Sequence, residues 1–290
     1  MEFKALATGY CFLEAPRVLG DDVWFSDLLL GGIYRCSRGG KVEKYLEDRH
    51  HVGGLAVNHD GKLICGGPGP IIWFDPATGK SGELLGDIPG ESFLGANDFI
   101  PDRNGGLCFG TLSKGADYSQ EPQLTQLFRL DKSGSVMKLS DGLKFSNGVG
   151  FSPDGSKLYH NESLLGTFVY DVAADGSLAD KRIFTERTDG DGLAVDAEGG
   201  VWIAHFDSTE VARYLPDGTI DQRHALPHKA VSSVAFGGAD WRDLYVTTAG
   251  DKGIESLFTG ELPPREATLF HARCDIPGVP VPETQFTLPD

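Results

Sequence analysis

The feature that most constrains this chain is a short motif that recurs six times. Each copy has a polar or small residue, an apolar run, a turn of about five residues and a second apolar run. The intervals between copies are 39, 44, 50, 44 and 41 residues, and the copies begin at Glu14, Gly53, Asn97, Asn147, Asp191 and Ser232. Repeats of about 40–50 residues built from short strands are typical of β-propeller blades.

The segments between the copies have room for a second hairpin in each blade. Candidate hairpins occupy residues 32–46, 125–139, 167–178 and 210–226. The 39 glycines and the absence of extended helical periodicity also favour an all-β fold. We therefore predict one domain over residues 1–290, a six-bladed β-propeller with four antiparallel strands per blade. The N-terminal residues and the segment "ATLFHARC" are expected to share a blade, which closes the ring.

Charge and hydropathy exclude several classes of partner. The formal net charge is -16, and no basic cluster is present, so we expect no nucleic-acid partner. No stretch approaches the roughly 20 apolar residues of a membrane span. The N-terminal segment lacks a basic region followed by an apolar one, which argues against a signal peptide. We expect a cytoplasmic protein with no membrane partner, either a monomer or a small homo-oligomer.

The cysteines are widely spaced, and several lie within apolar runs such as "GLCFG". No C-x-x-C motif is present, so we expect reduced core residues rather than disulfides or zinc ligands. The five residues are Cys11, Cys36, Cys65, Cys108 and Cys274.

The first residue of each repeat forms a candidate ring around the propeller axis. Four of the six positions carry a carboxylate or an amide, namely Glu14, Asn97, Asn147 and Asp191. Each could instead bond its own backbone in a turn. Two carboxylates converging in a channel would repel each other unless a cation lay between them. Oxygen ligands favour a hard cation, so we expect one divalent metal ion, first Ca²⁺, with Mg²⁺, Mn²⁺ or Zn²⁺ as alternatives.

Several segments resemble the gluconolactonase and senescence-marker-protein (regucalcin) lactonase family. They include "NDFIPDRNGGLCFGT", "SNGVGFSPDGSKLY", "DGLAVDAEGGVWIAH" and "VAFGGADWRDLYVTTA", and the resemblance runs from about residue 12 to 275. It implies a six-bladed propeller with a catalytic divalent metal on the axis. The family's metal-binding Glu, Asn and Asp fall on Glu14, Asn147 and Asp191, and Asn97 would contact substrate or metal-bound water.

Three features differ from the family or are unassigned. Sugar-lactone hydrolases of this family often carry Arg two residues before the Asn, where this chain has Gly95, which puts aldonolactone specificity in doubt. His160 and His205 follow the second strands of their blades, near the same mouth of the channel, and are expected to be structural or to contact substrate. The longest interval includes residues 111–126, a surface insertion or a lid over the central opening.

The expected function is metal-dependent hydrolysis of a small lactone, either a sugar lactone or a simple aliphatic γ- or δ-lactone. Asp191 is the candidate general base for the attacking water. Two alternatives stay open: a related propeller enzyme that acts on other esters or phosphotriesters or as a lyase, and a non-catalytic metal-stabilised binding propeller. No G-x-S-x-G, H-E-x-x-H or P-loop motif supports other chemistry.

Overall fold

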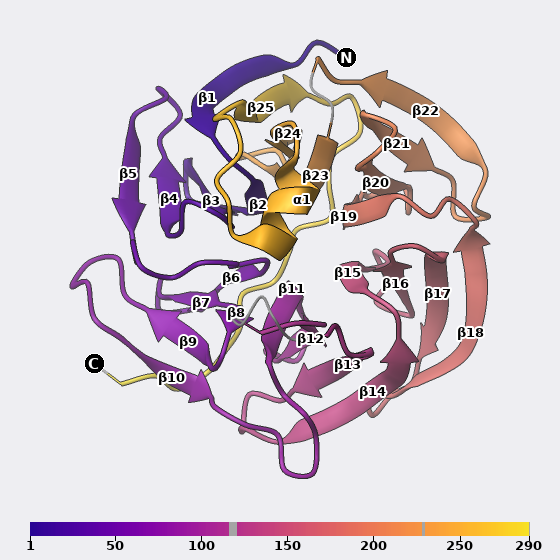
Figure 1. The fold of residues 1–290 in the computed structure, drawn as a ribbon. Coiled ribbons are helices and arrows are strands. Elements are labelled where there is room, and N and C mark those ends of the chain that lie inside the picture. Colours follow the sequence, from indigo (N-terminus) through magenta and orange to yellow (C-terminus); the bar gives the residue numbers. More distant parts are fainter. Residues whose placement is uncertain (116–120, 228–229, 290) are drawn as a thin grey trace.

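The structure is a computed structural model that describes residues 1–115, 121–227 and 230–289. Six antiparallel sheets surround a central axis as the blades of a propeller (Figure 1). The first strand of each blade lies nearest the axis. The six-bladed, four-stranded prediction is therefore confirmed.

The first three blades follow the chain from the N-terminal side. Blade 1 contains β2 (Leu13–Leu19), β3 (Asp22–Asp27), β4 (Ile33–Cys36) and β5 (Val42–Tyr45). Blade 2 contains β6 (Leu55–Val57), β7 (Leu63–Cys65), β9 (Ile71–Phe74) and β10 (Ser81–Leu85). Blade 3 contains β11 (Gly95–Pro101), β12 (Leu107–Thr111), β13 (Thr125–Leu130) and β14 (Val136–Leu143), and gains a fifth short strand, β8 (Gly67–Pro68), on β11.

The remaining blades complete the ring. Blade 4 contains β15 (Ser146–Phe151), β16 (Lys157–Glu162), β17 (Gly166–Val172) and β18 (Leu178–Thr185). Blade 5 contains β19 (Gly190–Val195), β20 (Val201–His205), β21 (Glu210–Tyr214) and β22 (Ile220–Ala225). Blade 6 contains β23 (Ala230–Gly237), β24 (Asp243–Ala249), β25 (Ala267–Arg273) and β1 (Lys4–Tyr10).

Blade 6 is built from both ends of the chain. Strand β1 pairs antiparallel with β25, from Lys4 opposite His271 to Tyr10 opposite Ala267. The predicted closure through "ATLFHARC" is confirmed, and the two strands lie side by side in Figure 1. Closure gives every inner strand a neighbour on each side and leaves no open gap in the ring.

One short helix departs from the all-strand expectation. Helix α1 (Gly253–Thr259) lies between β24 and β25 and is followed by the C-cap residue Gly260, which has φ 75°. It sits near the axis on the face seen in Figure 1. No helix in the described part of the chain is long and apolar enough to cross a membrane.

The core consists of side chains packed between neighbouring blades. Trp202 and Val211 of blade 5, for example, pack with Val234 and Phe270 of blade 6. All five cysteines are free and buried, as predicted. Because each cluster is shared by two blades, the blades stabilise one another.

The glycine turns of the repeat are held by buried ion pairs. In blade 5, Asp196 accepts backbone hydrogen bonds from Glu198 and Gly200, and Arg213 donates to it at 2.7 Å. In blade 3, Asp102 binds Arg129 in the same way, at 2.5 Å. The Asp-x-x-Gly-Gly segments of these two repeats thus fix the turn between the first two strands.

The C-terminal tail crosses the face where the inner strands end, behind the axis in Figure 1. Asn58 anchors it: the side chain donates to the carbonyl of Phe286 and accepts from Phe286 N and Thr284 Oγ1. Phe286 is buried in the core between blades 2 and 3.

We expect Asn58→Ala to lower the free energy of unfolding by about 2–4 kcal/mol, because it leaves buried polar groups of the tail unpaired. Asn104→Ala is the control, since Asn104 is exposed, and should change it by less than about 0.5 kcal/mol. Urea denaturation of both variants measures the difference. Equal, small effects would show that the tail is not anchored this way.

Candidate functional site

The ring positions coincide with irregularities in the inner strands. In β11, β15 and β19, two residues of the inner strand oppose one residue of the second strand. Asn97, Asn147 and Asp191 are the first of the two residues in each case. In β2 the same irregularity follows Glu14, and Ala15 there has φ 53°. A β-bulge of this kind bends the strand and re-aims its side chains.

Glycines at the ring allow neighbouring inner strands to approach closely. A Cβ on Gly53 would lie 2.0 Å from Asn97 Oδ1. A Cβ on Gly148 would lie 2.4 Å from the Asp191 carbonyl oxygen. Blade 2 therefore makes room for the Asn97 side chain, and blade 4 makes room for the backbone of blade 5.

The two predicted amides are in direct contact. Asn97 donates from Nδ2 to Asn147 Oδ1 at 3.0 Å and to the Ser146 carbonyl at 3.0 Å. Asn147 in turn donates from Nδ2 to Ser163 Oγ at 3.1 Å. The ring thus brings the side chains of blades 3 and 4 together. Ser232 is not part of this network, because its hydroxyl bonds the Leu13 carbonyl.

The two predicted carboxylates are buried and repel each other. Glu14 is 6% exposed and Asp191 is 7% exposed. Burial, and then the charges of Asp191 and Asp98, raise the pKa of Glu14 well above its usual value. Burial, and then Asp98, raise the pKa of Asp191 in the same way. Neither carboxylate forms an ion pair within the described residues, and the charge of Arg17 offsets the repulsion at Glu14 only in part.

Asp98 is a third buried carboxylate that our sequence reasoning did not assign to the site. It is 4% exposed and follows Asn97 as the second bulge residue of β11. Burial raises its pKa to about 6, against the opposing effect of Arg17. The only available signal was a carboxylate next to a ring residue, and the bulge that buries it could not be read from the sequence.

The donor set fits a hard cation in its chemistry. Glu14, Asn147 and Asp191 would supply two carboxylates and one neutral amide oxygen, the ligand types that such cations prefer. A cation would also relieve the repulsion that raises both carboxylate pKa values. In the described part of the chain, no three His, Cys, Asp or Glu side chains form a group that could hold a metal ion.

The segment "YHNES" supports the ring from the second strand of blade 4. His160 Nε2 lies 2.8 Å from Ser146 Oγ, and Asn161 donates to the Asp191 carbonyl at 2.5 Å. Ser163 binds both Asn147 and the Gly190 carbonyl. Burial lowers the pKa of His160 to about 3, so its imidazole is neutral at physiological pH. His160, Asn161 and Ser163 therefore hold the site residues Asn147 and Asp191 and their neighbours in position.

His205 has a structural environment in blade 5. Its Nδ1 lies 2.8 Å from Asp189 Oδ1 and its Nε2 lies 2.8 Å from the Tyr214 hydroxyl. Both ring nitrogens are therefore engaged within the protein. The next residue, Phe206, packs against Phe12 with ring centroids 5.6 Å apart. This aromatic pair joins blade 5 to the start of blade 1.

Gly95 excludes the arginine that the family often carries at this position. Its φ is 135°, and a Cβ would lie 2.2 Å from the Gly67 carbonyl oxygen. The cause is β8, which pairs with β11 through Gly95 opposite Pro68. The backbone of β8 therefore leaves no room for any side chain at position 95, and arginine could not be accommodated there without a change in the backbone.

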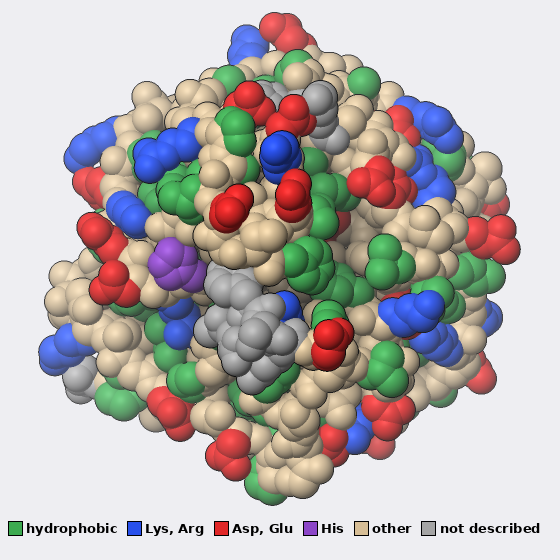
Figure 2. Space-filling view, in the orientation of Figure 1, with side chains coloured by type: hydrophobic (Ala, Val, Ile, Leu, Met, Phe, Trp, Pro, Cys, Tyr) green, Lys and Arg blue, Asp and Glu red, His purple; other side chains and the backbone are tan. Residues whose placement is uncertain are grey.

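Helix α1 lies on the same face as Lys114, the described residue at the start of the predicted insertion. In Figure 2 this face is hollowed near the axis beside α1, and hydrophobic side chains border the hollow. Lys114, at the start of the insertion, lies over the Phe258 ring of α1 at 5.8 Å. Residues 116–120 of the predicted 111–126 insertion lie outside the described residues, so its role as a lid stays a prediction.

We expect Gly95→Ala to lower the free energy of unfolding by more than about 3 kcal/mol, because backbone strain adds to a steric overlap. Gly134→Ala is the matched control: its φ is also positive, at 91°, but nothing lies within 4 Å of the added Cβ. It should cost about 1–2 kcal/mol. Thermal or urea unfolding compares the two, and equal losses would contradict the overlap with Gly67.

Asp98 generates a prediction about pH. Its folded-state pKa is about 6, above the ordinary 3.8, so protonation stabilises the fold. That contribution is complete below about pH 4 and is lost as the pH rises through about 6. Asp98→Asn should therefore gain stability relative to the natural chain as the pH rises from about 4 to 7, in metal-free buffer. Urea denaturation across this range measures the difference; a difference independent of pH would rule out the raised pKa.

Comparison with known proteins identifies the family. The model of the SMP-30/gluconolactonase/LRE-like region matches residues 12–250. A 6-deoxy-6-sulfogluconolactonase of Pseudomonas putida is 30% identical over 290 residues, covering 94% of this chain and 97% of the relative. A pentonolactonase of Haloferax volcanii is 32% identical over 243 residues, covering 80% and 79%.

Solved structures agree in fold. Regucalcin of Agrobacterium tumefaciens, described as a calcium-binding protein, has a TM-score of 0.79 and 24% identity, covering 98% of this chain and 97% of that one. At this identity the likeness shows the propeller fold. Together with the family match over most of the sequence, it confirms the resemblance seen in the motifs: the chain belongs to the SMP-30/gluconolactonase/LRE-like family.

Proposed function

We propose that this chain is a divalent-metal-dependent lactonase that hydrolyses the ester bond of a small lactone to the hydroxy acid. The observation that carries the proposal is the convergence of two buried carboxylates, Glu14 and Asp191, that have no basic ion-pair partner among the described residues. The lactonase names of the relatives from Pseudomonas putida and Haloferax volcanii support the reaction class.

Glu14, Asn147 and Asp191 would hold the cation. Ca²⁺ is the first candidate because the ligands are all oxygen, and the regucalcin structure is described as calcium-binding. Such a cation would supply Lewis-acid polarisation of the lactone carbonyl and electrostatic stabilisation of the developing oxyanion.

The other roles in the reaction fall to side chains of the ring and to the residues that support it. Asp191 is the candidate base that would orient and deprotonate the attacking water, because its carboxylate would lie at the edge of the cation. Asn97 donates both Nδ2 hydrogens within the protein, to Asn147 and Ser146. Its Oδ1 accepts no hydrogen bond from the described residues and is available to a substrate hydroxyl or to water. Asn161 and Ser163 keep the ring in position.

The substrate range proposed here includes lactones without several hydroxyl groups. Gly95 leaves no room for the guanidinium that would bind sugar hydroxyls. Aliphatic γ- and δ-lactones are therefore substrates to assay beside aldonolactones. Selectivity for aldonolactones, with no turnover of aliphatic lactones, would contradict this part of the proposal.

We expect Asp191→Ala to lower kcat/KM for lactone hydrolysis by at least about a thousandfold, because it removes both a ligand and the base. Calorimetric titration of the same variant with Ca²⁺ should show loss of the high-affinity site. Metal stripping should abolish turnover, and readdition of Ca²⁺, Mg²⁺, Mn²⁺ or Zn²⁺ should restore it to different extents.

Asp217→Ala is the control, since Asp217 lies in the exposed turn between β21 and β22 of the same blade. It should keep both activity and metal affinity. Full activity of Asp191→Ala would overturn the site assignment. Metal binding without hydrolysis of any lactone tested would favour a non-catalytic propeller.

A further inference from the structure

A cavity lies at the end of the channel opposite the ring. Its volume is about 530 Å³, and the ends of all six inner strands line it together with residues 279–283 of the tail. Cavities of about 300–1,000 Å³ are the size of small-molecule sites. None of the four predicted site residues lines this cavity.

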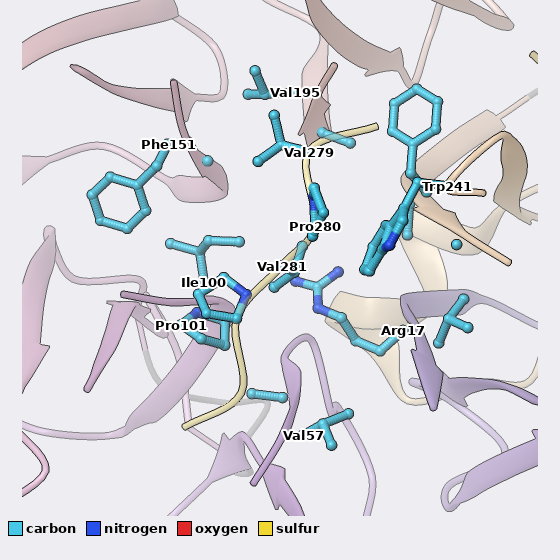
Figure 3. A pocket seen from close by; sticks show the side chains of 18 of the residues that line it. Arg17, Val57, Ile100, Pro101, Phe151, Val195, Trp241, Val279, Pro280 and Val281 are labelled. Carbon is cyan, nitrogen blue, oxygen red and sulfur yellow. The ribbon is translucent and has the colours of Figure 1, made fainter. Parts of the chain in front are cut away.

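The wall of this lower cavity is mostly apolar. Val57, Ile100, Phe151, Val195 and Trp241 come from different blades and border the same space (Figure 3). Such a wall favours an aliphatic chain, because burying apolar surface is worth roughly 25 cal/mol per Å².

Two arginines, Arg17 and Arg103, line this space, and Arg17 is the less exposed of the two. Arg17 extends from β2 toward Ile100 and Val281 in Figure 3. It donates from one terminal nitrogen to the Pro16 carbonyl and from the other to the Phe99 carbonyl, at 2.8 and 2.6 Å. Its Nε is buried and has no hydrogen-bond partner. No carboxylate of the described residues forms an ion pair with it, although Asp98 and Glu14 act on it electrostatically.

The tail spans the cavity as a strap. Val279 N donates to the Val195 carbonyl on one side, and Thr284 N donates to the Val57 carbonyl on the other. Within the described chain, no backbone hydrogen bond holds residues 280–283. Prolines at 280 and 282 lack the N–H needed for one. The strap is thus fixed at its ends and free of backbone bonds where it covers the cavity.

We propose that the lower cavity is a second ligand site, which takes a small carboxylate with an unbranched apolar chain. The guanidinium of Arg17 lines this space without a carboxylate ion-pair partner among the described residues, and a ligand carboxylate would give it a charge-assisted hydrogen bond. The apolar wall would then hold the chain. This site is independent of the proposed lactonase reaction at the other end of the channel.

The test uses the full chain and two probes of equal chain length. Octanoate and octan-1-ol are titrated separately by calorimetry, with intrinsic tryptophan fluorescence as a second readout because Trp241 lines the cavity. We expect octanoate to bind saturably with one site per chain, and octan-1-ol to bind at least about tenfold more weakly, because it lacks the charge. Equal affinities, or no saturable octanoate binding, would overturn the proposal.

Three variants locate the site. Arg17→Met should weaken octanoate at least about tenfold and leave octan-1-ol unchanged. Val57→Phe fills the cavity without touching Arg17 and should weaken both probes, which keeps the test valid if Arg17→Met fails to fold. Arg35→Met is the matched control, because its guanidinium pairs with Asp22 and does not line the cavity. Unchanged octanoate affinity in Val57→Phe would place binding elsewhere and reject the site.

Discussion

The candidate site depends on the pairing of β1 with β25. Glu14 belongs to blade 1 and Asp191 to blade 5, and blade 6 between them is made from both ends of the chain. The Ser232 hydroxyl of blade 6 bonds the Leu13 carbonyl beside Glu14. If β1 did not pair with β25, the distance between the Glu14 and Asp191 carboxylates would not be fixed through blade 6. Ring closure therefore controls both stability and the geometry of the ring.

Closure alone would not direct the ring side chains. The bulges in β2, β11, β15 and β19 do that locally, and glycines at positions 53 and 148 let the strands approach. The cost is electrostatic, because Glu14, Asp98 and Asp191 are buried near one another. Charged groups are rarely buried without compensation, and such sites commonly bind cations or perform chemistry. The positive charge of Arg17 offsets part of this negative charge, and the same side chain lines the lower cavity.

Some of the site was predictable from the repeat and some was not. Asn147 was identified because its position in the repeat matches that of Asn97, and the two amides are indeed hydrogen-bonded. Asp98 was not assigned, because alternation along a strand would turn it away from Asn97, and only the bulge buries it beside the ring. The roles of His160 and Asn161 were open, since they depend on which side chains the neighbouring strand presents.

The sequence by itself determined the number of blades, their strand pattern, the closing segment and the four ring positions. These follow from local alternation and from a repeat interval, both of which are properties of the linear chain. Only the tertiary structure decided the burial of Asp98, the exclusion of a side chain at Gly95 and the lower cavity around Arg17. Each of these arises from contacts between blades or with the tail, and the distance between two blades is not encoded in the periodicity of either one.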